Sequence, residues 1–489
     1  MATTEYAAAL QHLSQLALYG IKPGTERLAA VLQRLGDPQA AVPAIHIAGT
    51  NGKGSTAAYC ASLLLQAAGT LKKRGAAPLR IGLYTSPHLQ RVRERIQFSI
   101  DPEAGLRECS EEEFVRALAA VRAAADSAPA VTLTFFEALT ALAFVLWREV
   151  GVDLAVVETG LGGRLDATRL CTARVTVVTS IGLDHMELLG PTLADIAREK
   201  AGIFRPGVPA IAAADSAEAR SVLQAEAQRL GAPLRLYQPP EPKNERSSAP
   251  PHVPGETARV PSVQPLDAEL AAVIPLAGEH QLRNAALAVA AVQQVLDLGE
   301  GSLPGLLRNP QLVREGLART RWPGRLERLW PAALAPQSPR IELPAGAELW
   351  LDAAHNPEGA AALDLWLGQQ LEARPLTVLF GAVAGKQICD MTAPLGRAHH
   401  VVLTRPPSPR GLSAGELATM LAVGPAQPRV PMEQVEEVDA ALQAALRQTL
   451  PGGMLLVYGS IFLIAAVRAL VYGEEVDVLT VQDPGRTAR

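Results

Sequence analysis

The 489-residue chain has few cysteines, a weak net charge and no long uninterrupted apolar run. Its four cysteines are widely spaced and include no CxxC pair, which argues against a disulfide framework or a cysteine-based zinc site. The formal net charge of -4 and the sequence pI near 6.2 give no general attraction to nucleic acid or to an anionic membrane. Any anionic ligand must therefore be bound by a local arrangement of residues.

The N-terminal segment also lacks the basic flank and apolar core of a secretory signal, and no apolar run is long enough to cross a bilayer. We therefore expect a cytoplasmic protein. Hydrophobic residues make up 48% of the chain and charged residues 19%, a balance that is typical of compact globular proteins. Because the chain is longer than one hydrophobic core usually supports, we expect two or three domains.

What the sequence does contain is a glycine-rich turn between an apolar run and a helical pattern. Residues 42–48 favour a buried strand and residues 55–66 favour a helix, with three glycines and Lys53 between them. Glycines allow close approach to a phosphate, the helix start offers free N–H groups, and the lysine adds a positive charge. The strict GxxxxGK[ST] motif is not met, because Ile47 occupies the position of its first glycine. We interpret the segment as an altered P-loop; a turn that serves only packing is the alternative.

Three further predicted strands end in polar loops. They lie at residues 80–85, 153–158 and 174–180. Parallel strands end at one edge of a sheet, where open α/β sheets bind ligands. Glu158 is therefore a candidate Mg²⁺ ligand, and the acidic cluster around His185 is a second candidate metal site. A solvated glutamate, a hydrogen-bonded histidine and plain turns are the alternatives. Together with their connecting helices, these strands predict an α/β fold with a doubly wound, mostly parallel sheet.

A second, smaller α/β domain is predicted towards the C-terminus. Its strands are expected at residues 348–351, 376–380, 400–403 and 454–458. The predicted divisions of the chain are an N-terminal domain at residues 1–320, a hinge at 321–325 and a C-terminal domain at 326–489. Within the first domain, the proline-rich residues 238–267 indicate a loop or flexible insertion outside the core.

Eight short motifs follow one another along the chain. They are GTNGKGS (49–55), TSPHL (85–89), ETGLGGRLDAT (158–168), SIGLDH (180–185), EKAGIFRPG (199–207), GEHQLRNA (278–285), WPGR (322–325) and DAAHNP (352–357). In this order they resemble the folylpolyglutamate synthase and dihydrofolate synthase branch of the Mur ligase family, and together they are far more specific than any one of them. The resemblance implies an ATP-dependent amide ligase that holds its nucleotide between two domains.

The resemblance also implies roles for individual residues. Those implied to bind ATP are Gly52, Lys53, Gly54, Ser55, Asn284, Arg325 and Asp352. Two Mg²⁺ sites are implied, and their ligands would be Ser86, Glu158, His185 and Lys200. The family commonly carries a carbamylated lysine at the position of Lys200, which turns a cation into a carboxylate-like ligand. The residues implied in catalysis are Lys53, Lys200 and His355. The pterin substrate is implied to contact the turn at residues 20–27, the region beginning at Thr134, and Leu165, Asp166 and Ala167.

The implied reaction joins L-glutamate to dihydropteroate, to the glutamyl chain of tetrahydrofolate, or to both, through an acyl phosphate. We expect a monomer that acts on small molecules and binds neither nucleic acid nor membrane. A Mur ligase that builds peptidoglycan precursors is one alternative, and the TSPHL and EKAGIF motifs argue against it. A non-catalytic nucleotide-binding regulator is another, and the intact metal sites argue against that. The departures from the family pattern are Arg169, the triplet Gly385–Gln387 and the long insertion; they affect the expected substrate contacts rather than the metal ligands.

Overall fold

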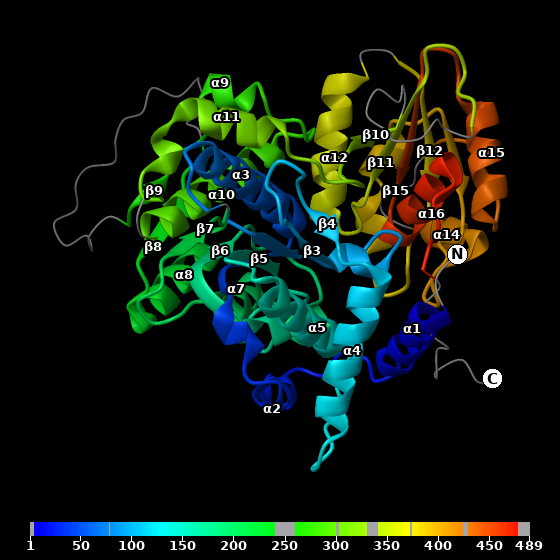
Figure 1. Cartoon of the computed structure of the whole chain (residues 1–489). Helices are drawn as coiled ribbons and strands as arrows, with labels where there is room; N and C mark the ends of the chain where they lie inside the picture. Colours follow the sequence, from blue (N-terminus) through cyan, green and yellow to red (C-terminus); the bar gives the residue numbers. More distant parts are fainter. Residues whose placement is uncertain are drawn as a thin grey trace.

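The computed structural model describes residues 4–77, 79–239, 260–299, 303–329, 341–371, 374–423 and 429–477. In this part of the chain it shows two α/β units, one built on a nine-stranded sheet and the other on a six-stranded sheet (Figure 1). The predicted fold class, a large mostly parallel sheet followed by a smaller α/β unit, is confirmed. The boundaries of the domains, at residues 320 and 326, stay predictions.

The N-terminal sheet has the strand order β4-β3-β2-β5-β1-β6-β7-β8-β9. Pairing is parallel from β2 to β9, whereas β3 and β4 extend one edge by antiparallel pairing. The strands are β1 (Pro43–Ala48), β2 (Ile81–Tyr84), β3 (Ile96–Phe98), β4 (Arg107–Glu108), β5 (Leu154–Glu158), β6 (Thr172–Val178), β7 (Ala210–Ala212), β8 (Leu234–Tyr237) and β9 (Ser262–Val263).

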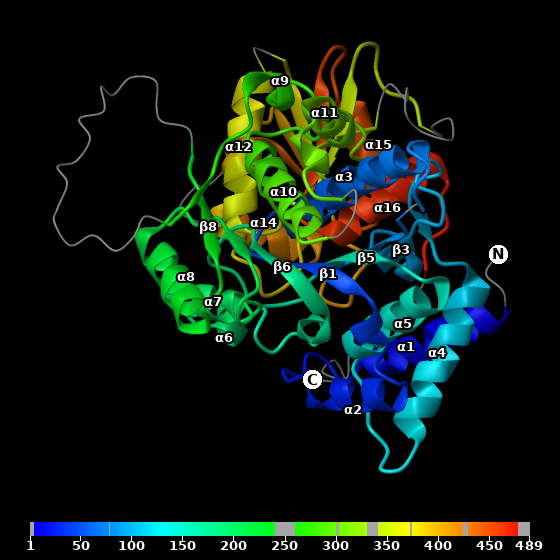
Figure 2. The same ribbon diagram turned by 60° about the vertical axis from the view of Figure 1, so that its left-hand side comes forward.

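Helices cover both faces of this sheet (Figure 2). On one face lie α3 (Lys53–Lys73), α10 (His280–Asp297) and α11 (Pro310–Ala318); on the other lie α1 (Thr4–Ala17), α2 (Glu26–Arg34), α4 (Glu111–Asp126) and α5 (Phe135–Val150). Because side chains alternate along a strand, Ile45 and Ile47 of β1 join the core beneath α3, whereas Ala44 joins the core beneath α5. A strand buried on both faces is apolar throughout, which explains why β1 is readable in the sequence.

The remaining helices of the N-terminal unit follow β6. They are α6 (Met186–Leu189), α7 (Leu193–Ala201), α8 (Ala217–Leu230) and α9 (Ala268–Ala271). Short 3-10 helices connect the main elements of the chain: η1 (Pro38–Ala41), η2 (Val92–Arg95), η3 (Ala167–Leu170), η4 (Leu306–Arg308) and η5 (Ile388–Met391).

The C-terminal sheet has the strand order β10-β11-β15-β12-β13-β14, with antiparallel pairing only between β10 and β11. The strands are β10 (Glu327–Arg328), β11 (Glu348–Asp352), β12 (Leu376–Phe380), β13 (His400–Leu403), β14 (Met432–Gln434) and β15 (Met454–Tyr458). The helices are α12 (Pro357–Gln370), α13 (Ala393–Gly396), α14 (Ala414–Val423), α15 (Val438–Gln448) and α16 (Ile461–Tyr472). Alternate residues of β15 again serve two cores, one beneath α12 and α14 and one beneath α15 and α16.

The structure corrects two details of the sequence analysis. The helix after the glycine turn begins at Lys53 and continues to Lys73, so it is longer than the predicted residues 55–66. The proline-rich stretch lies mostly outside the described residues, but its described part includes β9, and Val263 is buried in the core. Thr192 caps the start of α7, because its side chain accepts a hydrogen bond from the Asp195 N–H at 3.1 Å.

The strand order brings four functional loops together. β2, β5, β1 and β6 are neighbours and run in the same direction, so the loops that follow them meet at one edge of the sheet. The C-terminal unit lies against this edge through the loop between β11 and α12. Among the described helices, none combines the length and apolar character that a membrane crossing requires.

Candidate active site

The glycine turn between β1 and α3 is shaped by close neighbours from α10 and from the linker between the two units. Gly52 has a left-handed φ of 84°, and a Cβ atom at this position would clash with the carboxamide of Asn284 on α10. A Cβ atom on Gly54 would lie 2.8 Å from the Trp322 ring in the linker between the two units. Packing therefore demands these glycines, because only a residue without a side chain lets these neighbours approach the backbone of the turn so closely.

Two lysines converge on one carbonyl oxygen of this turn. Lys53 Nζ donates to the Gly49 carbonyl at 3.0 Å, and Lys200 Nζ, from α7, donates to the same oxygen at 2.9 Å. Lys200 is not a surface charge, because the residue is only 3% exposed. Burial, reinforced by the nearby charge of Lys53, lowers the pKa of Lys200 to about 7. Two buried amines at one oxygen make this turn a suitable place for an anion.

A carboxylate lies beside the turn at the end of β5. Glu158 is 3% exposed, and its Oε2 accepts a hydrogen bond from the Ser86 N–H at 3.0 Å. Parallel pairing of β2 with β5 places these residues next to each other. Burial raises the pKa of Glu158, while the positive charge of Lys53 opposes this rise. A carboxylate beside a serine hydroxyl is an oxygen donor set of the kind that Mg²⁺ prefers.

The loop after β6 supplies Asp184 and His185. His185 has a left-handed φ of 52° at the start of α6, and its side chain is 43% exposed. It lies within electrostatic range of both Lys53 and Lys200. The described residues contain no group of three or more His, Cys, Asp or Glu side chains that could hold a metal. The implied ligand sets differ from such a group, because they combine carboxylate, hydroxyl, imidazole and lysine.

The C-terminal unit closes over this edge through Asp184. Asn356 Nδ2 donates to Asp184 Oδ2 at 3.2 Å and to Asn51 Oδ1 at 3.0 Å. Lys386 Nζ forms an ion pair with Asp184 Oδ1 at 2.9 Å, and His355 Nε2 lies 3.9 Å from Asp184 Oδ2. Burial alone would raise the pKa of Asp184, but Lys386 and His185 outweigh it and hold that pKa well below its usual range.

The remaining residues implied to bind ATP lie around the turn and the linker. Asn284 Nδ2 donates to Gln281 Oε1 at 3.1 Å, and Gln281 Nε2 donates to Ser55 Oγ at 3.3 Å, which ties α10 to α3. Asp352 accepts hydrogen bonds at 2.8 Å from the Leu326 and Ala354 N–H groups. Burial raises the pKa of Asp352, while the charge of Arg325 opposes this rise. The structure thus gathers these residues where the two units meet.

The residues implied to bind the pterin form a separate group. The Gly24 N–H donates to the Leu165 carbonyl at 3.2 Å, and Arg27 pairs with Glu137 at 3.0 Å, so the three implied regions are brought together. Two of the side chains have local structural partners. Thr134 caps α5, and Asp166 accepts from the Thr168 and Leu161 N–H groups at 3.0 and 2.9 Å, respectively. Ala167 is buried, whereas Leu165 is 37% exposed. Substrate contact stays a prediction for all four.

Sequence reasoning missed the contacts that join the two units. Asn51 and Asn356 lie 305 residues apart in the chain, and each belongs to a motif that was recognised. Lys386 belongs to the triplet that departs from the family pattern, and its ion pair with Asp184 was not foreseen. Neither spacing nor composition shows which loop of one unit faces which loop of the other, so no sequence signal pointed to these pairs.

Fold and site together define a class of protein. Two α/β units meet over a glycine turn that offers free backbone, two lysine amines and a neighbouring carboxylate. This is the arrangement of a nucleotide-dependent enzyme that binds and transfers phosphoryl groups.

Comparison with known proteins makes this class specific. The Mur ligase middle domain matches residues 104–292, and the Mur ligase, glutamate ligase domain matches residues 340–461. The dihydrofolate synthase/folylpolyglutamate synthase of Bacillus subtilis is 33% identical over 404 residues, covering 82% of this chain and 84% of the relative. The chain belongs to the dihydrofolate synthase/folylpolyglutamate synthase family of Mur ligases, which are ATP-dependent, amide-forming ligases.

Solved structures agree with this assignment. E. coli FolC in complex with DHPP and ADP superposes with a TM-score of 0.73 at 28% identity, covering 96% of this chain and 98% of that one. The bifunctional folylpolyglutamate synthase/dihydrofolate synthase of Yersinia pestis, complexed with AMPPNP and a Mn ion, superposes with a TM-score of 0.71 at 29% identity. The superposition covers 96% of this chain and 98% of the Yersinia chain.

Proposed function

We propose that this ligase joins L-glutamate to dihydropteroate, to the glutamyl chain of a reduced folate, or to both, while ATP becomes ADP and phosphate. The Bacillus relative is named for both activities, and the E. coli relative binds DHPP and ADP. The observation that carries the proposal is the meeting of Lys53 and Lys200 at the Gly49 carbonyl, beside Glu158 and beneath the C-terminal unit.

The chemistry explains why phosphate-binding residues are needed to make an amide. A carboxylate is a poor electrophile because its leaving group would be oxide. Transfer of the ATP γ-phosphoryl group gives an acyl phosphate, the amine of glutamate attacks the acyl carbon, and phosphate leaves. Lys53 and Arg325 would stabilise the charge that spreads over the transferring group. Removing one such contact typically raises the barrier by about 3 kcal/mol.

The donor atoms of the site fit a divalent metal. Ser86 and Glu158 would hold one Mg²⁺, and His185 with Lys200 would hold a second. Bound there, Mg²⁺ would neutralise phosphate charge and orient the oxygens for in-line transfer. Carbamylation needs a neutral amine, and burial lowers the pKa of Lys200 to about 7, so a large share of this amine is neutral at neutral pH. The manganese complex of the Yersinia relative supports a metal in this family.

We infer that His355 receives a proton from the amine of glutamate. Its Nδ1 lies 2.8 Å from the Ala353 carbonyl, which makes Nδ1 the protonated nitrogen and leaves Nε2 as an acceptor. Burial, reinforced by the charge of Lys386, lowers the pKa of His355 to about 4, so the ring is neutral at physiological pH. A neutral ring facing the contact between the units suits a base that acts once the amine has been bound.

Closure of the two units would protect the acyl phosphate from water. The linker at residues 321–325 is the proposed hinge, and the contacts of Asp184 with Lys386 and Asn356 hold the closed arrangement. We propose that one protomer carries the complete site, because residues of both units meet within a single chain.

Phosphate release tests the function directly. Purified protein is given ATP, Mg²⁺ and glutamate, together with dihydropteroate or tetrahydrofolate. We expect phosphate release only when both glutamate and a pteroate-type acid are present, with a glutamylated product of the corresponding mass. Release that requires a UDP-sugar peptide instead would identify a peptidoglycan ligase. Nucleotide binding without release in any mixture would identify a regulator.

A further inference from the structure

A cavity of about 500 Å³ lies between the two units, next to the proposed metal ligands. Its lining includes Ser86 and Glu158, residues of α3, the linker at residues 321–325, and Ile461 and Arg468 of α16. The volume is in the range of small-molecule sites. None of the residues implied to bind the pterin lines it. The cavity therefore provides space beside the reacting centre that the pterin region does not occupy.

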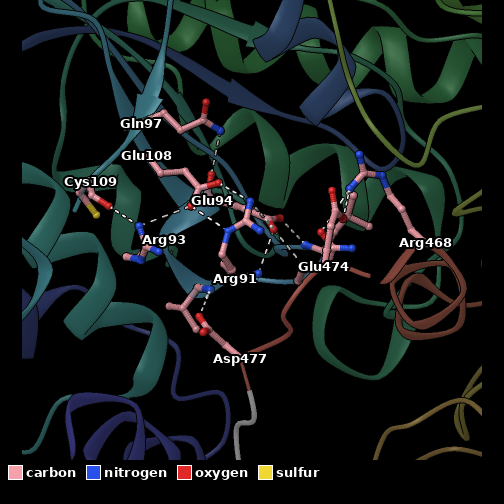
Figure 3. A network of polar contacts seen from close by, with 12 residues as sticks. Arg91, Arg93, Glu94, Gln97, Glu108, Cys109, Arg468, Glu474 and Asp477 are labelled. Atoms are coloured by element: carbon pink, nitrogen blue, oxygen red, sulfur yellow. Dashed lines mark hydrogen bonds and ion pairs between the residues drawn. The ribbon is translucent and has the colours of Figure 1, made fainter. Parts of the chain in front are cut away.

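Apart from Glu158, the acidic side chains that line this cavity are paired within the protein (Figure 3). Glu108 forms two hydrogen bonds with Arg91, at 2.8 and 3.1 Å, and Glu474 pairs with Arg468. Glu94 accepts three backbone N–H groups, from residues 89–91, at 2.7 to 3.0 Å. These carboxylates are already neutralised or hydrogen-bonded, so they do not make the cavity a site for a cation.

Two donors on the cavity wall have no such partner. Gln90 is 1% exposed, and its Nε2 has no hydrogen-bond partner among the described residues, although its Oε1 accepts from Arg468 Nη1 at 3.2 Å. Arg321, in the linker, forms no hydrogen bond or ion pair with any described side chain. A buried amide donor without a partner is costly, and a guanidinium binds a carboxylate through two parallel hydrogen bonds. Both residues line the cavity, and both donor groups are suited to an anionic oxygen.

The reaction creates a need for such a site. Each added glutamate leaves one more α-carboxylate on the acceptor, while the terminal γ-carboxyl must return to the same centre beside Glu158. The residues that were added earlier must therefore lie somewhere near that centre. We propose that this cavity binds the α-carboxylates of the γ-glutamyl residues already on the acceptor, with Arg321 and Gln90 as donors. This inference rests on the proposed function and adds to it the part of the substrate that determines chain length.

The test compares acceptors of different length in one variant. Arg321→Gln is made on an exposed residue, so the fold is expected to persist. Arg314→Gln, on an exposed arginine of α11 that does not line the cavity, is the matched control. For each protein, kcat/KM is measured with dihydropteroate and with reduced folates that carry one and three glutamates. KM for free glutamate is measured with every acceptor.

We expect Arg321→Gln to lower kcat/KM for the triglutamate acceptor by about tenfold relative to that for dihydropteroate, whereas the control changes neither. Arg321→Lys, which keeps the charge, is expected to restore part of the loss. An equal effect on all acceptors, or no effect, overturns the proposal. A raised KM for free glutamate with every acceptor also overturns it, because the cavity would then hold the incoming amino acid. If the unmodified protein ligates no acceptor, the proposed function itself fails.

Discussion

Two of the contacts between the units are built differently. At the active-site contact, side chains gather around Asp184, whose partners are Lys386 and Asn356. At the C-terminal contact, the segment after α16 lies against the loop that follows β2. There the Asp477 N–H donates to the Gln90 carbonyl at 2.8 Å, and Asp477 Oδ2 accepts from the Val92 N–H at 2.7 Å (Figure 3).

We infer from this difference that the active-site contact is the surface that closes, whereas the C-terminal contact acts as the pivot. Side-chain pairs around one carboxylate can exchange partners when substrates enter. The C-terminal contact uses backbone groups on both sides, and Tyr6 OH adds a further hydrogen bond to Asp477 Oδ2 at 2.6 Å. Arg468 of α16 joins this contact to the linker, because it pairs with Glu327, which in turn accepts the Gly324 N–H at 2.8 Å. Changes at the first contact should therefore reduce turnover, and changes at the second should reduce stability.

The largest expected effect is at Lys200, beneath the active-site contact. Lys200→Ala should lower the rate of ligation by about 100-fold or more, because it removes a proposed metal ligand and one of the two amines at the Gly49 carbonyl. ATP binding, measured by calorimetry, should persist. Lys73→Ala, at an exposed position at the end of α3, is the control and should leave both unchanged. Full activity in Lys200→Ala would exclude a carbamate at this residue.

The next largest effect is expected for the ion pair that holds the units together. The side chains of Asp184 and Lys386 are only 14% and 12% exposed, so removing one partner leaves the other charge poorly solvated. Asp184→Asn and Lys386→Met should each lower kcat/KM by about 30-fold, equivalent to about 2 kcal/mol. If the pair acts as a unit, kcat/KM of the double variant should be no lower than that of the less active single variant. Additive losses would show that the two residues act separately.

The two contacts also show how far the sequence predicts this molecule. Strands such as β1 and β5 are recognisable because burial on both faces makes them apolar throughout. The two-residue β9 is not, because a short edge strand in a proline-rich stretch carries no periodic signal.

The site residues likewise include some that the sequence predicts and some that it does not. The loops carrying Glu158 and His185 were placed at one edge, because parallel strands end together. The burial of Lys200 was not visible, since it depends on how α7 packs against the glycine turn rather than on the spacing within the helix. Contacts between the units, such as Lys386 with Asp184, depend on how two separate sheets face each other.

A moderate effect on stability is expected at the pivot. Asp477→Ala removes the acceptor for the Val92 N–H and for Tyr6 OH, which should lower the free energy of unfolding by about 1–2 kcal/mol. The midpoint of urea unfolding should fall, whereas kcat/KM at 25 °C should stay within about twofold of the unmodified protein. A loss of activity much larger than the loss of stability would contradict the separation of pivot from closing surface.

The smallest expected effect is on the pH dependence of the stability that Tyr6 contributes at the pivot. Burial, and then the hydrogen bond to Asp477, raises the pKa of Tyr6 above its ordinary value near 10. The folded protein therefore favours the protonated phenol, and its contribution to stability is complete below pH 10 and is lost as the pH rises above that value. Tyr6→Phe should cost about 1 kcal/mol at pH 7, and the difference from the unmodified protein should shrink in unfolding curves between pH 10 and 11. Other buried tyrosines titrate equally in both proteins, so their effects cancel in the comparison. A difference that stayed constant across this range would mean that the Tyr6 hydroxyl does not stabilise the pivot.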